Sequence, residues 1–415
     1  MSGIQQDLKI PDVVEFARRD ARRVVSGLHT EGAYELTEYT FGALVPDRED
    51  PLCNVAMANC ALTINFWVGC AWQCAYCHVQ GSLEDLNDDG VMPKSTRRRT
   101  KHSIDEVIDA LITHPFFSPN QTVLSLGGSS TEPLAPGHVV ESTFDFMEAL
   151  QERGYRNPFW IVTKRGMPAK YMQRLERICK NGPSVLISVC WAGNPVELEP
   201  VQNNRFLNAR AAHEAGATID WYLRPLAPAW GTGPEKLEEM IREVGESYGD
   251  FIHAVVPGAL RWTEGVDRAV RGARGMSLPA SMQEDATGND KEDLPQELAE
   301  AVLEYCAQYL PGTPVYFKSS CAQSHMMHRS SLGAVDLLAR HDCEMSRCPA
   351  SQRAVCSTGP AHSMSVDGVQ RIIDRLRLPL RVLDWDDRSK LPHTVPPLER
   401  ETYAISQMVE NSLNL

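Results

Sequence analysis

The sequence predicts an α/β protein: a partial (β/α)6 TIM-type barrel followed by a cysteine-rich C-terminal region. Short apolar runs alternate with amphipathic helical stretches between residues 61 and 258, an order typical of βα units around a parallel sheet. Six such units in about 200 residues favour a partial barrel over an open sheet. Seven of the twelve cysteines fall in two groups, one after the first predicted strand and one near the C-terminus.

Each element follows from its apolar pattern and its boundary residues. The predicted strands are residues 61–67, 121–127, 158–164, 184–191, 217–226, 251–258 and 314–320. Helices are predicted at residues 11–26, 103–114, 139–154, 169–182, 204–216, 234–249, 295–310, 367–377 and 399–412. Ser103 and Glu106 have the spacing of a capping box, and Gly154 is a helix-ending residue.

These elements divide the chain into four segments. Residues 1–60 are expected to form a helical N-terminal extension, and residues 61–258 the barrel. Residues 259–294 are rich in Gly, Asp and Arg and are predicted to be a polar connecting loop. Residues 295–415 hold the second group of cysteines and form the expected C-terminal region.

The composition and charge of the chain limit the classes of protein to which it can belong. The chain has 415 residues, 43% of them hydrophobic, which is enough for a large core without disulfide bonds. The net charge of −13, from 41 basic and 54 acidic residues, disfavours nucleic acid as a partner. No apolar run reaches the roughly 18 residues of a membrane span. The N-terminus does not resemble a secretory signal, so we expect a cytoplasmic protein.

The first cysteine group follows the first predicted strand. Cys70, Cys74 and Cys77 have the spacing C-x3-C-x2-C, and three thiols in eight residues cannot all point one way on a helix or strand. A loop wrapped around a soft metal centre accommodates them. A [4Fe–4S] cluster held by three cysteines leaves one iron open to chelate S-adenosylmethionine (SAM). A zinc loop is the alternative, although zinc sites usually pair two C-x2-C knuckles.

With Tyr76 before the third cysteine, this motif resembles that of the radical SAM superfamily. STEPLAP (130–136), IVTKRG (161–166), LISVCW (186–191) and the stretch from LEP (198–200) through Arg205 to LRPLAP (223–228) resemble its spore photoproduct lyase-like branch. The resemblance covers about residues 61–230. It implies an enzyme that cleaves SAM reductively to a 5′-deoxyadenosyl radical, which then abstracts a hydrogen from the substrate.

The same resemblance implies residues that contact SAM. A glycine-rich turn after the second strand holds the methionine amino group in the superfamily, and polar residues at strand ends hold the ribose and carboxylate. The corresponding residues here are Tyr76, Gly127, Gly128, Ser129, Ser130, Glu132, Lys164, Ser188 and Arg224. The usual acidic residue directly after the glycines is replaced by Ser129 and Ser130. Cys190 is a candidate hydrogen donor, although a buried packing thiol is the commoner role.

The second cysteine group comprises Cys321, Cys343, Cys348 and Cys356. Four thiolates suffice to close a second, auxiliary [4Fe–4S] cluster or a zinc site. We place the iron–sulfur cluster first, zinc second and a set of metal-free thiols third. Cys53, Cys60, His325, His328 and His341 are other possible ligands.

The sequence thus predicts a radical SAM lyase or oxidoreductase acting on a small polar substrate, such as a cationic aminosugar, nucleoside or amino acid. Dehydration, epimerisation or a related rearrangement is the expected reaction, with a flavodoxin- or ferredoxin-type reductant as partner. The alternatives are a DNA-lesion lyase of the spore photoproduct type and a peptide- or protein-modifying enzyme. A non-enzymatic electron carrier would need four cysteines at each cluster, and the first motif has three.

Overall fold

The computed structural model describes only part of the chain. The described residues are 55–58, 61–77, 96–98, 102–113, 117, 119–120, 122–127, 131–200, 205–227, 230, 233–260, 264–274, 294–328, 346–358, 381–386 and 391–395. Residues 1–54 of the predicted N-terminal extension lie outside these ranges, as do the helices predicted at 11–26, 367–377 and 399–412, and Cys53, Cys60, His341 and Cys343.

A seven-stranded sheet organises the described chain, in the order β1-β2-β5-β6-β7-β8-β9. β1 (Val55–Ala58) pairs antiparallel with β2. The other six strands run parallel: β2 (Ala61–Ile64), β5 (Leu124–Leu126), β6 (Phe159–Thr163), β7 (Val185–Cys190), β8 (Thr218–Tyr222) and β9 (Ile252–Val255). The α/β class and the six parallel strands are confirmed. β1 and β9 are the edges of the sheet, so the hydrogen-bonded strands do not form a closed barrel.

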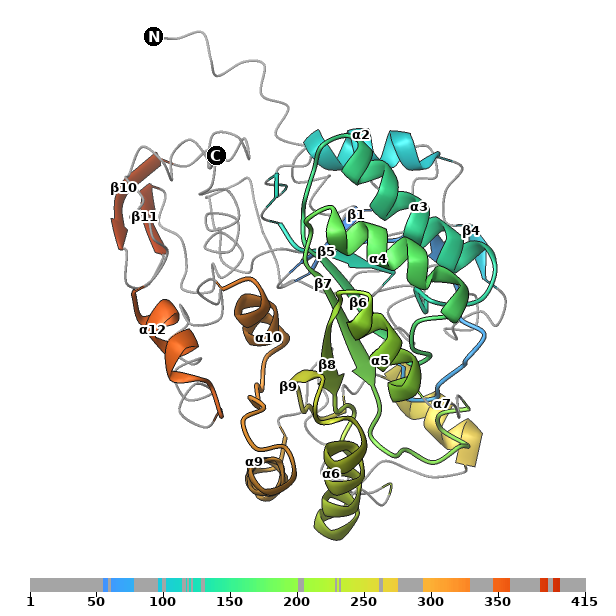
Figure 1. Cartoon of the computed structure of the whole chain (residues 1–415), viewed down its shortest axis with the longest axis vertical. Coiled ribbons are helices and arrows are strands. Elements are labelled where there is room, and N and C mark those ends of the chain that lie inside the picture. The colour runs from blue at the N-terminus through green and yellow to red at the C-terminus, as the bar shows by residue number, and fades with distance from the viewer. Residues whose placement is uncertain are drawn as a thin grey trace, which may run out of the picture.

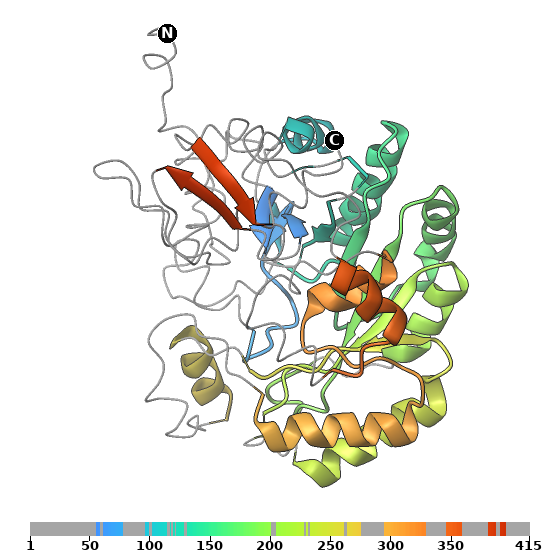
Figure 2. The ribbon, with the colours of Figure 1, turned by 90° about the vertical axis from the view of Figure 1, so that its left-hand side faces the viewer.

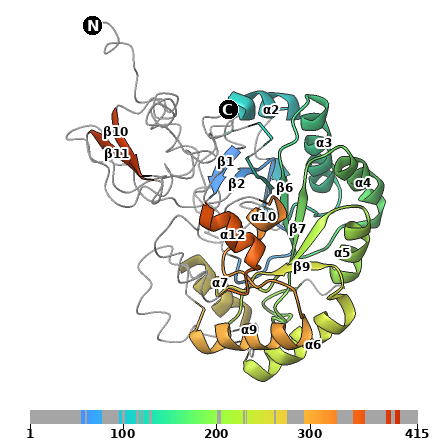
Figure 3. The ribbon, with the colours of Figure 1, turned by 60° about the vertical axis from the view of Figure 1, so that its left-hand side comes forward.

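Helices cover the outer side of the sheet one after another (Figures 1 and 3). They are α2 (Ile104–Thr113), α3 (His138–Glu152), η3 with α4 (Ala169–Tyr171 and Met172–Lys180), α5 (Arg205–Glu214) and α6 (Pro234–Tyr248). The predicted capping box begins α2: Ser103 Oγ accepts from the Glu106 amide at 3.2 Å, and Glu106 Oε2 accepts from the Ser103 amide at 2.7 Å. Gly154 lies just beyond α3 with φ 89°, as its predicted helix-ending role requires.

Alternation along the strands gives the sheet two different faces. Ile187 and Val189 of β7 point outward and join the large core under the helices. Leu186 and Cys190 point to the inner face, where they form a second cluster with Trp160 and others. Buried polar side chains, such as Ser188, share this inner face, so the interior of the curved sheet is only partly apolar.

The second half of the chain continues with helices α7 (Glu264–Arg274), α9 (Gln296–Tyr309), α10 (Ser319–Met326) and α12 (Ala350–Thr358). Two small antiparallel pairs complete the described elements: β3 (Trp67–Val68) with β4 (Arg97–Arg98), and β10 (Arg381–Asp386) with β11 (Leu391–Val395). α9 runs beside α6 (Figure 2), and Gly245 lets the α9 backbone approach closely, because a Cβ there would lie 2.3 Å from the Tyr309 carbonyl oxygen.

Two sequence predictions are wrong in this half. The predicted polar loop at 259–294 contains helix α7, whose Val266 and Val270 pack beside Trp230 and Leu260. The predicted strand at 314–320 reduces to one bridge between Val255 and Val315, after which the chain turns into α10. The apolar run PVYF has the composition of a strand, but it makes a single bridge to the edge strand β9 before the chain enters helix α10.

Helix α10 lies against the inner face of the sheet. Ala322 and Met326 belong to the same buried cluster as Trp160, Cys190 and Tyr222. The Tyr222 and Ser319 hydroxyls share a hydrogen bond of 2.5 Å, which joins the end of β8 to the start of α10. Helix α10 is therefore packed into the interior of the curved sheet. Among the described residues, no helix has the length and apolarity needed to cross a membrane.

Candidate functional site

The three cysteines of the first motif lie in a loop at the C-terminal edge of the sheet, after β2 and β3. Gly69 and Gln73 adopt positive φ values of 97° and 49°, which turn the loop back on itself. The Gln73 side-chain amide donates to the Cys70 carbonyl at 2.8 Å. From the turn after β5, the Thr131 hydroxyl donates to the Gly69 carbonyl at 2.6 Å. The loop is thus fixed from within and from the neighbouring strand.

The thiols of this loop influence one another and are shielded from water. Cys74 is 5% exposed, and Cys70 and Cys77 are half-buried. Burial raises the pKa of Cys70 and of Cys74 to about 12, with smaller increases from the neighbouring thiols. In this environment the thiolate forms need a nearby positive charge, which a bound metal centre would supply.

A cluster and a single ion require different ligand geometries. No three His, Cys, Asp or Glu side chains among the described residues converge as ligands of one metal ion. In a cubane cluster each cysteine binds a different iron, so the sulfurs face the cluster from separate corners. Three grouped thiols that do not meet at one point are compatible with that geometry.

Tyr76 anchors the cysteine loop to two other strands. Its hydroxyl donates to Glu199, which follows β7, and accepts from Lys164 Nζ at the end of β6 at 2.5 Å. Lys164 Nζ also lies 4.1 Å from the centre of the Tyr76 ring and 3.6 Å from Glu199 Oε2. The Trp230 ring, 5.6 Å away, packs against the same tyrosine.

A buried ion pair completes this anchor. Arg205, the first residue of α5, donates to Glu199 and to the Cys190 carbonyl, and both charged side chains are 3% exposed. Glu199 therefore joins the cysteine loop to β7 and α5. Neither Glu199 nor Arg205 was predicted as a site residue. Their only sequence signal was membership of the stretch from 198 to 205 that resembles the lyase-like branch.

The Glu132 carboxylate already accepts hydrogen bonds from groups within the protein. Its buried carboxylate accepts from the Thr163 hydroxyl at 2.5 Å, from the Lys164 amide at 3.0 Å and from the Leu134 amide at 3.3 Å. Burial raises the pKa of this carboxyl, and these hydrogen bonds partly offset the increase. The role it visibly plays is to hold the turn after β5 against the end of β6.

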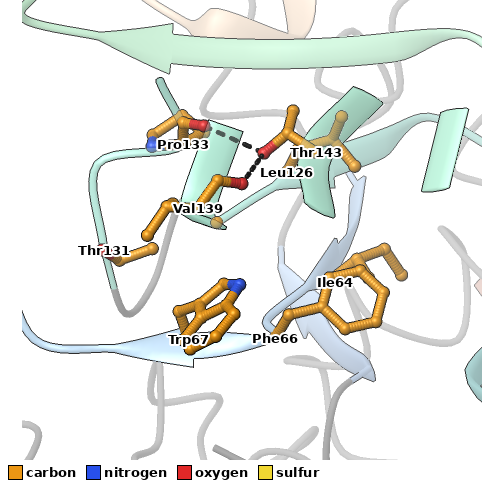
Figure 4. Close-up of a pocket in the computed structure, with 9 residues that line it drawn as sticks. Ile64, Phe66, Trp67, Leu126, Thr131, Pro133, Val139 and Thr143 are labelled. Carbon is orange, nitrogen blue, oxygen red and sulfur yellow. Dashed lines mark hydrogen bonds between the residues drawn. The ribbon is translucent and has the colours of Figure 1, made fainter. Parts of the chain in front are cut away.

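Gly127 begins that turn with φ 68°, and its amide donates to the Ile64 carbonyl at 2.8 Å. The predicted partners Gly128, Ser129 and Ser130 lie outside the described residues. A small, mainly apolar pocket lies behind the turn, between the strands and α3 (Figure 4). Thr143 at its border donates to the Pro133 and Val139 carbonyls at 2.9 and 3.1 Å, so this polar group is satisfied within the wall.

Ser188 lies inside the curved sheet rather than at its rim. Its hydroxyl accepts from Trp160 Nε1 at 2.7 Å and hydrogen-bonds the Asp220 carboxyl of the next strand. Burial raises the pKa of Asp220 to about 7. Asp220 Oδ1 is buried and has no partner among the described residues. Sequence reasoning missed Asp220, which stands in an otherwise unremarkable strand pattern.

Arg224 follows β8 at the same edge of the sheet. Its guanidinium lies over the Tyr222 ring, 4.4 Å from the centroid, and against Gly258, where a Cβ would come within 2.5 Å of Nε. Nε and Nη2 are buried and have no partner within the described part of the chain. Orphaned guanidinium donors of this kind indicate a missing acceptor, such as a carboxylate or ordered water.

Cys190 ends β7 within the inner-face cluster. It is buried beside Trp160 and Tyr222. Burial raises the pKa of its thiol to about 11 despite Lys164 and Arg205 nearby. The structure thus places Cys190 beside the polar interior, in surroundings that keep the thiol protonated.

The second cysteine group also comes together, with one member outside the described residues. Cys321 lies on α10, not at the end of a strand as predicted, while Cys348 precedes α12 and Cys356 lies within it. All three thiols are near enough to the Tyr316 hydroxyl to help raise its pKa. Cys343, the predicted fourth ligand, is not described.

Comparisons with known proteins find structural neighbours only. No protein-family model matches the chain, and no curated protein matches it. A single-residue variant of spore photoproduct lyase has a TM-score of 0.47 at 18% identity, covering 62% of this chain and 76% of the lyase. Spore photoproduct lyase complexed with dinucleoside spore photoproduct has a TM-score of 0.46 at 16% identity, over 61% and 75%. Values this low transfer no function, which must come from the residues of this chain.

Proposed function

We propose that this protein is a radical SAM enzyme. The observation that carries the proposal is the cysteine loop itself: three shielded thiols in one loop at the C-terminal edge of a parallel sheet. In α/β folds of this kind, ligands bind at the carboxyl ends of the strands. Cys70, Cys74 and Cys77 would hold a [4Fe–4S] cluster there. When bound, such a cluster with one open iron supplies the reductive cleavage of SAM.

Among the described residues, one strand-end cation keeps open donors for the SAM carboxylate. Lys164 is engaged with the Tyr76 hydroxyl and Glu199. Arg224 instead keeps Nε and Nη2 without partners in the described structure. We therefore assign the carboxylate contact to Arg224 and a positioning role to Lys164. The Gly127 turn, with Gly128, Ser129 and Ser130, remains the proposed contact of the methionine amino group.

The inner face favours a small polar substrate. Ser188 and Asp220 lie deep in the interior, at no more than 1% exposure, and α10 packs across the same face. Asp220 Oδ1 can accept a hydrogen bond from a substrate hydroxyl or amino group. An interior so enclosed suits dehydration, epimerisation or a related rearrangement of a small molecule. The net charge of −13 again disfavours the DNA-lesion alternative.

Two further parts of the proposal concern electron transfer. Cys321, Cys348 and Cys356 would contribute to a second, auxiliary [4Fe–4S] cluster, with its fourth ligand still to be assigned. A flavodoxin- or ferredoxin-type protein would deliver the electron to the first cluster. Cys190 is assigned to packing, because its side chain is buried in the inner-face cluster beside Trp160 and Tyr222.

The direct test is SAM cleavage by anaerobically reconstituted protein. With dithionite and SAM, the unaltered chain should release 5′-deoxyadenosine, and pools of small polar metabolites should be screened for faster release. The Cys70→Ala/Cys74→Ala/Cys77→Ala variant should release none while keeping its circular dichroism spectrum. Cys179→Ala is the matched control, since Cys179 lies on α4, outside the loop. Cleavage that persists in the triple variant refutes the proposal.

A further inference from the structure

The second cysteine group is assembled around Tyr316. The bridge between Val255 and Val315 fixes the preceding residue at the edge strand β9. Burial raises the pKa of Tyr316, and Cys348, Cys321 and Cys356 add to the increase. Cys321 and Cys348 also pack against the inner-face cluster. Three thiols, from α10, the segment before α12 and α12 itself, thus lie near one tyrosine.

His325 belongs to the same group by position. It lies four residues after Cys321 on α10, so both side chains project from one side of the helix. Its ring centre is 5.9 Å from that of Tyr316, in an edge-on arrangement. The Nδ1 atom of His325 is buried and has no partner in the described structure.

A second imidazole supports His325 from the sheet. The His253 ring of β9 lies against it, with centroids 4.5 Å apart. His253 Nε2 is likewise buried and unpartnered among the described residues. Two adjacent imidazoles with unmatched buried nitrogens are unusual, because unpaired polar atoms destabilise the fold. A metal centre bound to His325 would explain one of them.

A buried guanidinium points to an anionic centre. Arg347 directly precedes Cys348, and its amide donates to the Val315 carbonyl at 3.1 Å, next to Tyr316. Its Nη1 is buried without a partner in the part of the chain that the structure describes. An unpaired buried cation is costly unless an opposite charge lies nearby. A cluster held by three thiolates carries negative charge and would supply that partner.

We propose that His325 is the fourth ligand of the second cluster, with Cys321, Cys348 and Cys356. This inference rests on the second centre proposed above and replaces the predicted Cys343. A neutral imidazole in place of a fourth thiolate lowers the negative charge that must be buried beside Ala322 and Met326. Such a cluster should have a higher reduction potential than one with four thiolates.

The test uses the full-length Cys70→Ala/Cys74→Ala/Cys77→Ala variant, reconstituted anaerobically with iron and sulfide. This background should bind about four irons per chain. After reduction, pulsed electron paramagnetic resonance should detect a strongly coupled nitrogen. His325→Cys should keep the iron, lose the nitrogen coupling and lower the reduction potential. His328→Gln is the matched control, because His328 lies beyond the end of the same helix, and it should change neither signal.

Several outcomes overturn the inference. Nitrogen coupling that persists in His325→Cys shows another ligand, and loss of the iron in Cys343→Ala assigns the fourth position to that cysteine. If the triple variant binds only zinc, the second centre is not an iron–sulfur cluster. Failure of the proposed function looks different, because it appears in the unaltered chain as an absence of 5′-deoxyadenosine, whatever the iron content of the triple variant.

Discussion

Removing the Glu199 carboxylate should strongly destabilise the protein. In Glu199→Ala, Arg205 keeps its charge at 3% exposure without its carboxylate partner, and Tyr76 loses the acceptor of its hydroxyl. Water cannot screen a charge buried this deeply. Breaking a buried ion pair by removing one partner typically lowers the free energy of unfolding by about 3–5 kcal/mol, and we expect a loss in that range.

The measurement is urea unfolding of the apoprotein, with Asp250→Ala as the matched control. Asp250 also pairs with an arginine, Arg210, but the two side chains are 63% and 37% exposed. Its removal should cost at most about 1 kcal/mol. A Glu199→Met/Arg205→Met double variant should recover most of the lost stability, because neither charge of the fully buried pair remains.

The same substitution has a functional signature. Since Glu199 holds the Tyr76 hydroxyl, Glu199→Ala should also reduce iron incorporation at the first motif. Two results would refute this reasoning: a stability loss no larger than that of Asp250→Ala, or a double variant as unstable as the single one. Either would mean that Arg205 is neutralised by some group other than Glu199.

Three other predictions concern the edge and interior of the sheet. Arg224→Gln should weaken SAM binding in equilibrium dialysis by roughly ten- to a hundredfold, since hydrogen bonds to charged groups contribute about 1.5–3 kcal/mol, while iron content stays unchanged. Cys190→Ala should lose about 1 kcal/mol of stability and keep its product pattern; an altered product would identify the thiol as a hydrogen donor. Because burial raises the pKa of Asp220 from 3.8 to about 7, its contribution to stability is present below pH 3.8 and disappears as the pH rises through about 7. The melting temperature of Asp220→Asn should therefore rise relative to that of the unaltered protein as the pH increases from about 5 to about 8. If the two melting temperatures change equally over this range, the assignment is contradicted.

Local pattern was enough to predict the elements of the sheet. The strands from Ala61 to Val255 and helices α2 to α6 match the apolar runs, and the capping box of Ser103 and Glu106 forms as expected. These features depend on neighbouring residues, which a sequence displays directly. The strand prediction for PVYF is wrong for the same reason. Its composition suits a strand, but only the tertiary structure decides that Val315 makes a single bridge.

The contacts of the site were harder to predict. Cys70, Cys74 and Cys77 are close in sequence, so their spacing alone singled them out. Glu199 and Arg205 form a buried pair with Tyr76, which lies 123 residues before Glu199. The neighbouring residues in the sequence do not indicate that either charged side chain is buried. Asp220 likewise acquires its raised pKa from burial, which the hydrogen bond to Ser188 partly offsets, and a strand pattern displays neither.

The two cysteine groups differ in how the protein holds them. The first loop is held by protein contacts through Tyr76, the Gly69 carbonyl and the Ala75 amide, which donates to the Leu198 carbonyl at 2.9 Å. Such a loop can keep its form before a cluster binds. The second group joins α10 to α12 across a long stretch of chain, so a metal centre there would close a large loop. The first site is therefore suited to exchanging its ligand during turnover, whereas the second would also contribute to the stability of the C-terminal region.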